Sequence, residues 1–165
     1  MNNKGFLSII FRAAIFIFLL SYAGTATAGI AGPFASGHGN LIIEGERRTF
    51  SFHARELKNG RVIGSLVLKN RNLGIRAKAI INCLDIDGNQ ATMSGVITQI
   101  NGDYSSLIGD DIWFRVVDNG EGFRNTTDQI TLVIVELDEP PSAICTEDVD
   151  VDLQNILGGN IQVNP

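Results

Sequence analysis

The sequence predicts an all-β protein, either an antiparallel β-sandwich or a partly open barrel of about seven or eight strands. The strands are expected to follow one another as a meander of hairpins. Three observations lead to this prediction. Apolar and polar residues alternate with a period of two in several segments, clusters of Gly, Asn and Asp separate these segments, and no apolar stripe of period 3.6 persists after residue 28. A length of 165 residues and a hydrophobic content of 44% suit one folded domain.

The first 28 residues have the pattern of a secretory signal peptide. Lys4 and Arg12 give a basic start, residues 13–23 form an uncharged run, and Ala26-Thr27-Ala28 supplies a small-x-small cleavage site. The uncharged run is shorter than the ~20 apolar residues that a membrane span needs. We therefore expect export to the periplasm or the medium, cleavage after Ala28, and no membrane span in the mature chain.

The remaining chain divides into three parts by composition. Residues 29–40 are rich in Gly and small residues and predict a flexible leader. Residues 41–137 predict the β-domain core. Residues 138–165 predict an acidic tail with a final edge strand near residues 159–163.

The first predicted hairpin of the core has a clear turn signal. Residues 47–55 alternate, with Phe50 and Phe52 on one face of a half-buried strand. Asn59-Gly60 then favours a two-residue turn because both residues tolerate positive φ. Residues 62–68 are expected to form the return strand.

The second half of the core continues in the same manner. Residues 74–86 alternate and end at the turn Asp87-Gly88-Asn89, and a strand follows as far as Ile100. Residues 112–117 predict another strand, and the run 130–135, apolar except for Thr131, predicts a strand that is covered on both faces. The predicted core consists of Phe50, Phe52, Leu66, Leu84, Phe114, Ile130 and Leu132.

Several fragments of the chain resemble a family of small secreted bacterial β-domains, the post-COAP domains. The main matching fragments are TFSFHA at residues 49–54, NQATMSG at 89–95, FRVVDNGEG at 114–122 and GNIQV at 159–163. The resemblance covers residues 39–163, and it implies an all-β fold without implying an activity. Cys83 and Cys145, and the insertion Arg124-Asn125, depart from the pattern of the family.

Cys83 and Cys145 form an even pair of cysteines in a chain that is predicted to be exported, which favours a disulfide bond. The alternative is two unpaired thiols, with Cys83 in the core and Cys145 on the tail. The chain has no Cys-x-x-Cys motif, and two cysteines cannot form a four-thiolate zinc site.

The only cofactor that the sequence suggests is calcium. Asp118, Asn119, Glu121 and Asp128 bracket one predicted hairpin loop, and oxygen ligands of this kind bind Ca²⁺ when they converge. The alternative is turn chemistry, because Asp and Asn also cap the backbone of loops.

Charge is distributed unevenly along the chain. The net charge of −5 becomes −7 once the two bases of the predicted signal peptide are removed, so nucleic-acid binding is not expected. Residues 41–78 nevertheless hold nine bases and three acids. In one interpretation, this basic half pairs with the acidic end of the chain or faces water. In the other, it associates head to tail with another copy of the chain or binds an anionic ligand.

The sequence does not identify a catalytic motif. It contains no Gly-x-Ser-x-Gly, no His-Glu-x-x-His and no phosphate-binding Gly loop with Lys. Our first hypothesis is an exported, non-catalytic β-domain with a structural, adhesion or partner-binding role in the cell envelope or outside the cell. The alternative is a small-ligand carrier barrel, which an apolar cavity would favour. A hydrolase with an unrecognised site is a weaker third hypothesis.

Overall fold

The computed structural model describes residues 32–120, 127–131, 133–136, 145–146, 149–150 and 152–165. The predicted signal peptide, Glu121 and Leu132 therefore lie outside the described residues. In the described part of the chain no helix is long and apolar enough to cross a membrane.

The described residues form one antiparallel sheet of ten strands, with a short 3-10 turn η1 at Ser105–Leu107. The strand order is β10-β1-β2-β3-β4-β5-β6-β7-β9, and β8 pairs with β6. The strands are β1 (Phe34–Ile43), β2 (Glu46–Glu56), β3 (Val62–Asn70), β4 (Ile75–Asp87), β5 (Gln90–Ile100), β6 (Asp111–Val117), β7 (Gln129–Thr131), β8 (Ile134–Glu136), β9 (Leu153–Asn155) and β10 (Gly158–Asn164).

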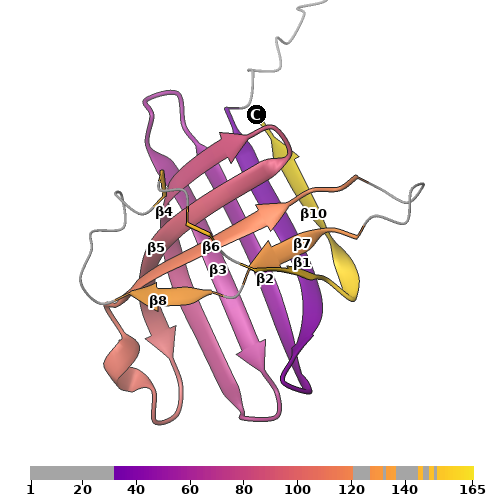
Figure 1. The fold of residues 1–165 in the computed structure, drawn as a ribbon. Helices are drawn as coiled ribbons and strands as arrows, with labels where there is room; N and C mark the ends of the chain where they lie inside the picture. The colour runs from indigo at the N-terminus through magenta and orange to yellow at the C-terminus, as the bar shows by residue number, and fades with distance from the viewer. Residues whose placement is uncertain (1–31, 121–126, 132, 137–144, 147–148, 151) are drawn as a thin grey trace, which may run out of the picture.

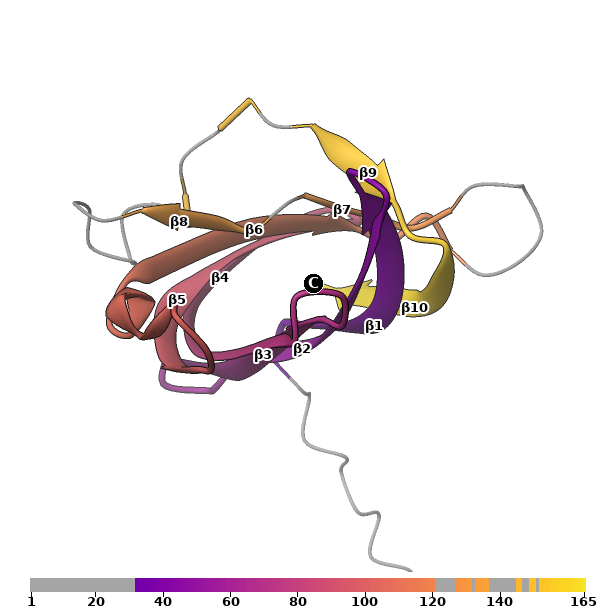
Figure 2. The ribbon, with the colours of Figure 1, turned by 90° about the horizontal axis from the view of Figure 1, so that it is seen from below.

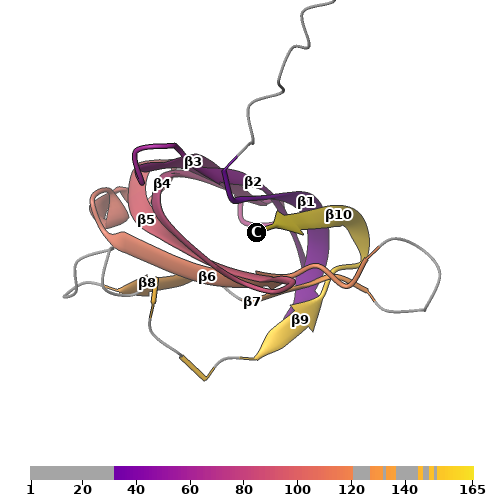
Figure 3. The same ribbon diagram turned by 90° about the horizontal axis from the view of Figure 1, so that it is seen from above.

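The sheet curls around a central axis, as Figures 1–3 show, and the end-on views of Figures 2 and 3 look along the interior. The prediction of an all-β, antiparallel meander is confirmed, and the partly open barrel is the closer of the two predicted architectures. The described residues form ten strands where about seven or eight were predicted, because the short strands β7, β8 and β9 add to the long hairpins.

The hairpin between β2 and β3 forms at the predicted Asn59-Gly60 position, but its loop is longer than the two residues predicted. The backbone N–H of Leu57 donates a hydrogen bond to the carbonyl oxygen of Arg61, and three residues lie between them. Gly60 has a φ of +77°, and the backbone N–H of Arg61 donates a hydrogen bond of 3.1 Å to Oδ1 of Asn59. Phe50 and Phe52 are buried on the inner face of β2, whereas Ser51 and His53 on its outer face are exposed. The alternation of the sequence therefore fixes which face of the strand points inward.

The Gly-rich stretch that predicted a flexible leader is instead mostly strand. Residues 34–40 belong to β1, which pairs with β2 on one side and with β10 on the other. A Cβ atom at Gly37 would lie 2.7 Å from Cε1 of Phe52, and one at Gly39 would lie 2.9 Å from Cζ of Phe50. The glycines are thus required for the close packing of two aromatic rings, which composition alone cannot distinguish from flexibility.

A β-bulge in β4 changes which residues face inward. The pairing of β4 with β5 shifts register between Ile81 and Cys83, so Asn82 is an extra residue. Simple alternation groups Ile80 with Leu84, but Ile80 is 55% exposed, whereas Leu84 packs against the core. The same shift places Cys83 opposite Ser94, on the outer face of the sheet.

Most of the predicted core is buried as expected. Phe50, Phe52, Leu66, Phe114 and Ile130 all belong to the buried cluster, while Leu84 is partly buried beside it and Leu132 lies outside the described residues. The core extends beyond the predicted 41–137 segment, because Ala35 of β1 and Ile161 of β10 are also buried. β10 includes residues 159–163, where the sequence predicts a final edge strand.

Candidate ligand-binding pocket

The interior of the barrel contains an apolar pocket of about 320 Å³. The inner faces of β2 to β5 line it on one side, and Ile130, Thr131, Val133 and Val135 line it on another. Its apolar lining includes Leu41, Leu66, Leu68, Ile97, Ile100 and Ile130. The volume falls within the range of about 300–1,000 Å³ that is usual for small-molecule sites.

Small side chains on β4 create part of this space. Ala77 and Ala79 face the interior and lie opposite Leu68 and Leu66 of β3. Both positions carry only a methyl group, so the inner surface of β4 lies farther from the axis of the barrel than it would with longer side chains. The pocket therefore follows from side-chain size rather than from a break in the sheet.

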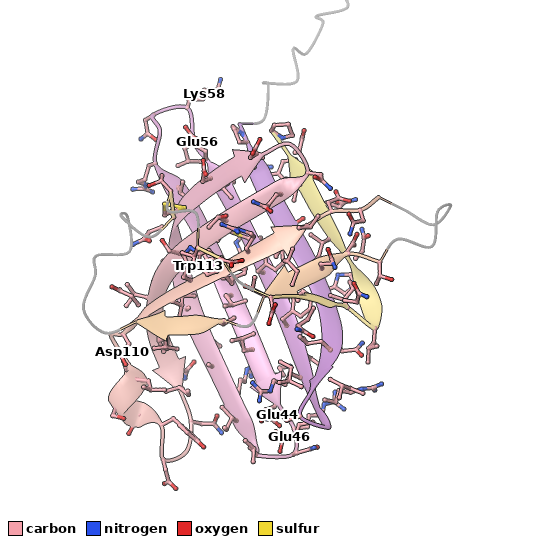
Figure 4. All side chains as sticks on the ribbon, viewed as in Figure 1. Glu44, Glu46, Glu56, Lys58, Asp110 and Trp113 are labelled. Atoms are coloured by element: carbon pink, nitrogen blue, oxygen red, sulfur yellow. A yellow bond between two sulfur atoms is a disulfide. The ribbon has the colours of Figure 1, made fainter. Side chains whose placement is uncertain are left out.

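The pocket opens at the end of the barrel where β1 turns into β2 and β3 turns into β4. Ile43 and Leu73, which flank these turns, belong to the lining. Figure 4 shows Glu44 and Glu46 at this end and Glu56 with Lys58 at the opposite end. We call the opening the mouth, and its rim includes the exposed apolar side chains of Leu73, Tyr104 and Val135.

Arg48 brings a positive charge into the lining of the pocket. It lies on the inner face of β2, in register with Leu41 of β1 and Asn70 of β3, both of which are buried. Its Nε atom is buried and has no hydrogen-bond partner among the described residues. Sequence reasoning missed this site, although the alternation that put Phe50 and Phe52 inward also puts Arg48 inward.

The neighbouring polar groups are already hydrogen-bonded. Nδ2 of Asn70 donates a bond of 2.6 Å to Oε2 of Glu46, and Oδ1 of Asn70 accepts the backbone N–H groups of Asn72 and Leu73. Asn70 thus closes the turn between β3 and β4 and supports the mouth.

Three of the four predicted calcium ligands, Asp118, Asn119 and Asp128, lie at the seam between β10, the end of β6 and the start of β7. Oδ2 of Asp128 accepts the N–H of Ile161 at 2.8 Å, and Oδ2 of Asp118 accepts the N–H of Val163 at 3.0 Å. Oδ1 of Asp128 accepts the N–H of Asn119, and Oδ1 of Asp118 accepts that of Gly120, each at 2.9 Å. All four carboxylate oxygens therefore bind backbone N–H groups, and the two carboxylates connect strands that share no backbone ladder here.

No group of three or more His, Cys, Asp or Glu among the described residues is arranged to hold a metal ion. Glu121, the fourth predicted ligand, lies outside the described residues, so the calcium site stays a prediction. The observed bonds agree with the alternative that the sequence left open, in which these residues organise the backbone.

Cys83 and Cys145 form a disulfide bond, with Cα atoms 5.9 Å apart and a separation of 62 positions in the sequence. Cys145 is buried against the outer face of the sheet, where Ser94 and Trp113 are also buried. Nη1 of Arg115 on β6 donates a bond of 3.1 Å to the carbonyl oxygen of Val149, and its guanidinium lies 5.2 Å from the ring of Trp113. The disulfide and Arg115 thus hold Cys145 and Val149 against the outer face of the sheet.

One carboxyl group at the start of β6 has a shifted pKa. Partial burial, together with the charge of the adjacent Asp110, raises the pKa of Asp111 above its usual value. Figure 4 shows Asp110 at the margin of the sheet, below Trp113.

No protein family, curated protein or solved structure matches this chain. The resemblance to the post-COAP domains therefore stays a prediction.

Proposed function

We propose that the mature chain is an exported, non-catalytic β-domain that binds a small apolar ligand inside its barrel. The observation that carries the proposal is the pocket of about 320 Å³, with its apolar lining and its exposed apolar rim. Such a cavity is the feature that favours a carrier over a structural or adhesion module, whose interior would be filled. Burial of a ligand there gains roughly 25 cal/mol for each Å² of apolar surface that leaves water.

The composition of the lining supports a binding role rather than catalysis. Its described residues include no Asp, Glu, His, Cys or Ser, the groups from which most nucleophiles and general bases come. The polar members of the lining are Arg48, Thr49, Lys69, Asn70, Lys78, Tyr104 and Thr131.

Two features support export. The amino-terminal pattern of a basic start, an uncharged run and a small-x-small site is typical of a signal peptide. The disulfide between Cys83 and Cys145 is the kind of bond that persists in oxidising compartments outside the cytoplasm.

The proposal can be tested with Nile red, an uncharged dye whose fluorescence increases in apolar surroundings. The full chain is expressed with export, and the mass of the processed protein is measured to locate its amino terminus. We expect saturable binding of one dye molecule per chain. The variant Ala77→Phe, which fills the pocket from β4, should abolish this binding.

Ile80→Phe is the matched control, because it adds an aromatic ring to the exposed outer face of the same strand. This variant should bind the dye as the wild type does. Circular dichroism and melting curves confirm that both variants are folded. Failure of the wild type to bind Nile red, or equal binding by the wild type and Ala77→Phe, would contradict the proposal and return attention to protein partners in the envelope.

A further inference from the structure

The guanidinium of Arg48 has an unmet hydrogen-bonding requirement. Its Nε atom is removed from water and donates to no described residue. A buried N–H without an acceptor costs about 1–3 kcal/mol, so donors in this position are usually bonded in the working state of a protein.

The surroundings of Arg48 do not supply an acceptor for this atom. Leu41 on one side is apolar, and Oδ1 of Asn70 on the other side already accepts two backbone N–H groups. The carboxylate of Glu46, two residues earlier on the same face of β2, accepts Nδ2 of Asn70 and forms no hydrogen bond with Nε of Arg48. Because Arg48 also lines the pocket, a turn of its side chain would present this edge of the guanidinium to an acceptor that enters there.

We propose that the pocket binds an amphiphile with an anionic headgroup, and that Arg48 binds this headgroup just inside the mouth. This inference rests on the proposed function, because it specifies the ligand of the same pocket. The apolar chain of the ligand lies between β2 to β5 and the side chains of Ile130 and Val133, where most of the lining is aliphatic. The headgroup stays near the turns that carry Glu44 and Leu73.

A carboxylate is the headgroup that fits this arrangement best. Its two oxygens match the edge of a guanidinium formed by Nε and one Nη, which gives two parallel, charge-assisted hydrogen bonds. One of these bonds satisfies the buried Nε. Four exposed bases lie in or beside the turns at the mouth and outnumber Glu44 and Glu46 there, which adds a favourable potential for an approaching anion. These bases are Arg47, Lys69, Arg71 and Arg76.

The test compares two ligands that share a ten-carbon chain and differ in the headgroup. Decanoate and 1-decanol are titrated against the processed protein at neutral pH, and their affinities are measured by displacement of Nile red. We expect decanoate to bind about tenfold more tightly than 1-decanol, since a charge-assisted pair replaces an unpaired donor.

Arg48→Met removes the guanidinium while keeping an unbranched, largely apolar side chain. This variant should weaken binding of decanoate about tenfold and leave binding of 1-decanol unchanged. Arg47→Met is the matched control, because Arg47 is the exposed neighbour on the outer face of β2 and loses the same charge. Arg47→Met should retain the preference of the wild type for decanoate.

The outcomes separate this inference from the proposed function. If Nile red binds but the wild type binds decanoate no better than 1-decanol, the pocket stands and the role of Arg48 is overturned. The same holds if Arg48→Met and Arg47→Met lower decanoate binding equally, since the effect is then one of net charge. If the wild type binds neither Nile red nor either ligand, both proposals are overturned. The comparison of decanoate with 1-decanol uses the wild-type protein, so its result does not depend on whether the variants fold.

Discussion

The two ends of the barrel differ although the same sheet forms both. At the end near Glu56 and Lys58, Phe52, Met93, Phe114, Val116 and Ile161 are buried, and none of them lines the pocket. We call this the filled end. The rings of Phe52 and Phe114 meet edge to face across it, with centroids 5.5 Å apart. The hollow end, which contains the pocket and its mouth, has aliphatic residues and the two alanines of β4 in equivalent inward positions.

The difference between the two ends shows that alternation and side-chain size determine separate properties of the barrel. Alternation determines which side chains of a strand face the interior. The volumes of those side chains then determine whether the interior is packed or empty. The filled end therefore provides the stability of the domain, and the hollow end is available for a ligand.

The largest expected effect is a loss of stability when a large side chain is removed from the filled end. Phe114→Ala should lower the free energy of unfolding by about 3–5 kcal/mol, because it creates a cavity at a fully buried position. Leu68→Ala at the hollow end should cost only about 1–2 kcal/mol, since Leu68 is partly exposed and already borders empty space. Urea unfolding of the two variants measures the difference, and equal losses would mean that the ends do not differ as described.

The next effect concerns the disulfide on the outer face of the sheet. The double variant Cys83→Ser/Cys145→Ser should lower stability by about 2–4 kcal/mol, because the bond closes a long loop in the unfolded chain. Affinity for Nile red should change little, as the bond lies outside the barrel. Thermal unfolding and dye titration check both parts. Two free thiols in the processed wild-type protein would show that the bond does not form.

A smaller effect is expected at the seam between β10 and β7. Asp128→Ala removes the acceptor of two backbone N–H groups and should cost about 1–3 kcal/mol. The amide proton of Ile161 should then exchange faster with solvent than it does in the wild type. Asp85→Ala is the control, because Asp85 is an exposed acid on β4. Unchanged exchange at Ile161 would contradict the role that we assign to the seam.

The smallest effect involves Asp111 at the start of β6. Its pKa is raised in the folded state, so the folded protein retains this proton more readily than the unfolded chain does. The wild type consequently loses stability as the pH rises from 3.8, the ordinary pKa of an Asp side chain, through the raised pKa of Asp111. Asp111→Asn should therefore be slightly more stable than the wild type at neutral pH, and this advantage should vanish in acid. If the stability advantage of Asp111→Asn over the wild type grew as the pH fell, the result would contradict a raised pKa for Asp111.

Much of the fold could be predicted because its signals are local. The Asn59-Gly60 turn and the alternation around Phe50 and Phe52 specify one hairpin without reference to the rest of the chain. The Gly-rich segment of β1 could not be recognised, because Gly37 and Gly39 are needed only once the aromatic rings of β2 lie against them. The bulge at Asn82 was missed for a similar reason, since it depends on the pairing with β5.

Less of the candidate site than of the fold could be predicted from the sequence. A pocket arises from the sum of side-chain volumes across the eight strands β1 to β8, and no single motif records that sum. Arg48 could have been found from its inward position in the alternating pattern, but its buried Nε depends on Leu41 and Asn70 in neighbouring strands. The acids at Asp118 and Asp128 were recognised as a cluster, whereas their bonds to β10 required the folded sheet.

The measurement that tests the central claim most directly is a methyl NMR titration of the processed protein with Nile red. Methyl groups of Leu and Ile report on both ends of the barrel and on its outer face. We predict saturable shifts at Leu68 and Ile100 in the hollow end, and little change at Ile161 in the filled end. Shifts confined to the exposed outer residues Ile63 and Ile80, or no saturable shifts at all, would contradict the assignment of the hollow end as a ligand-binding pocket.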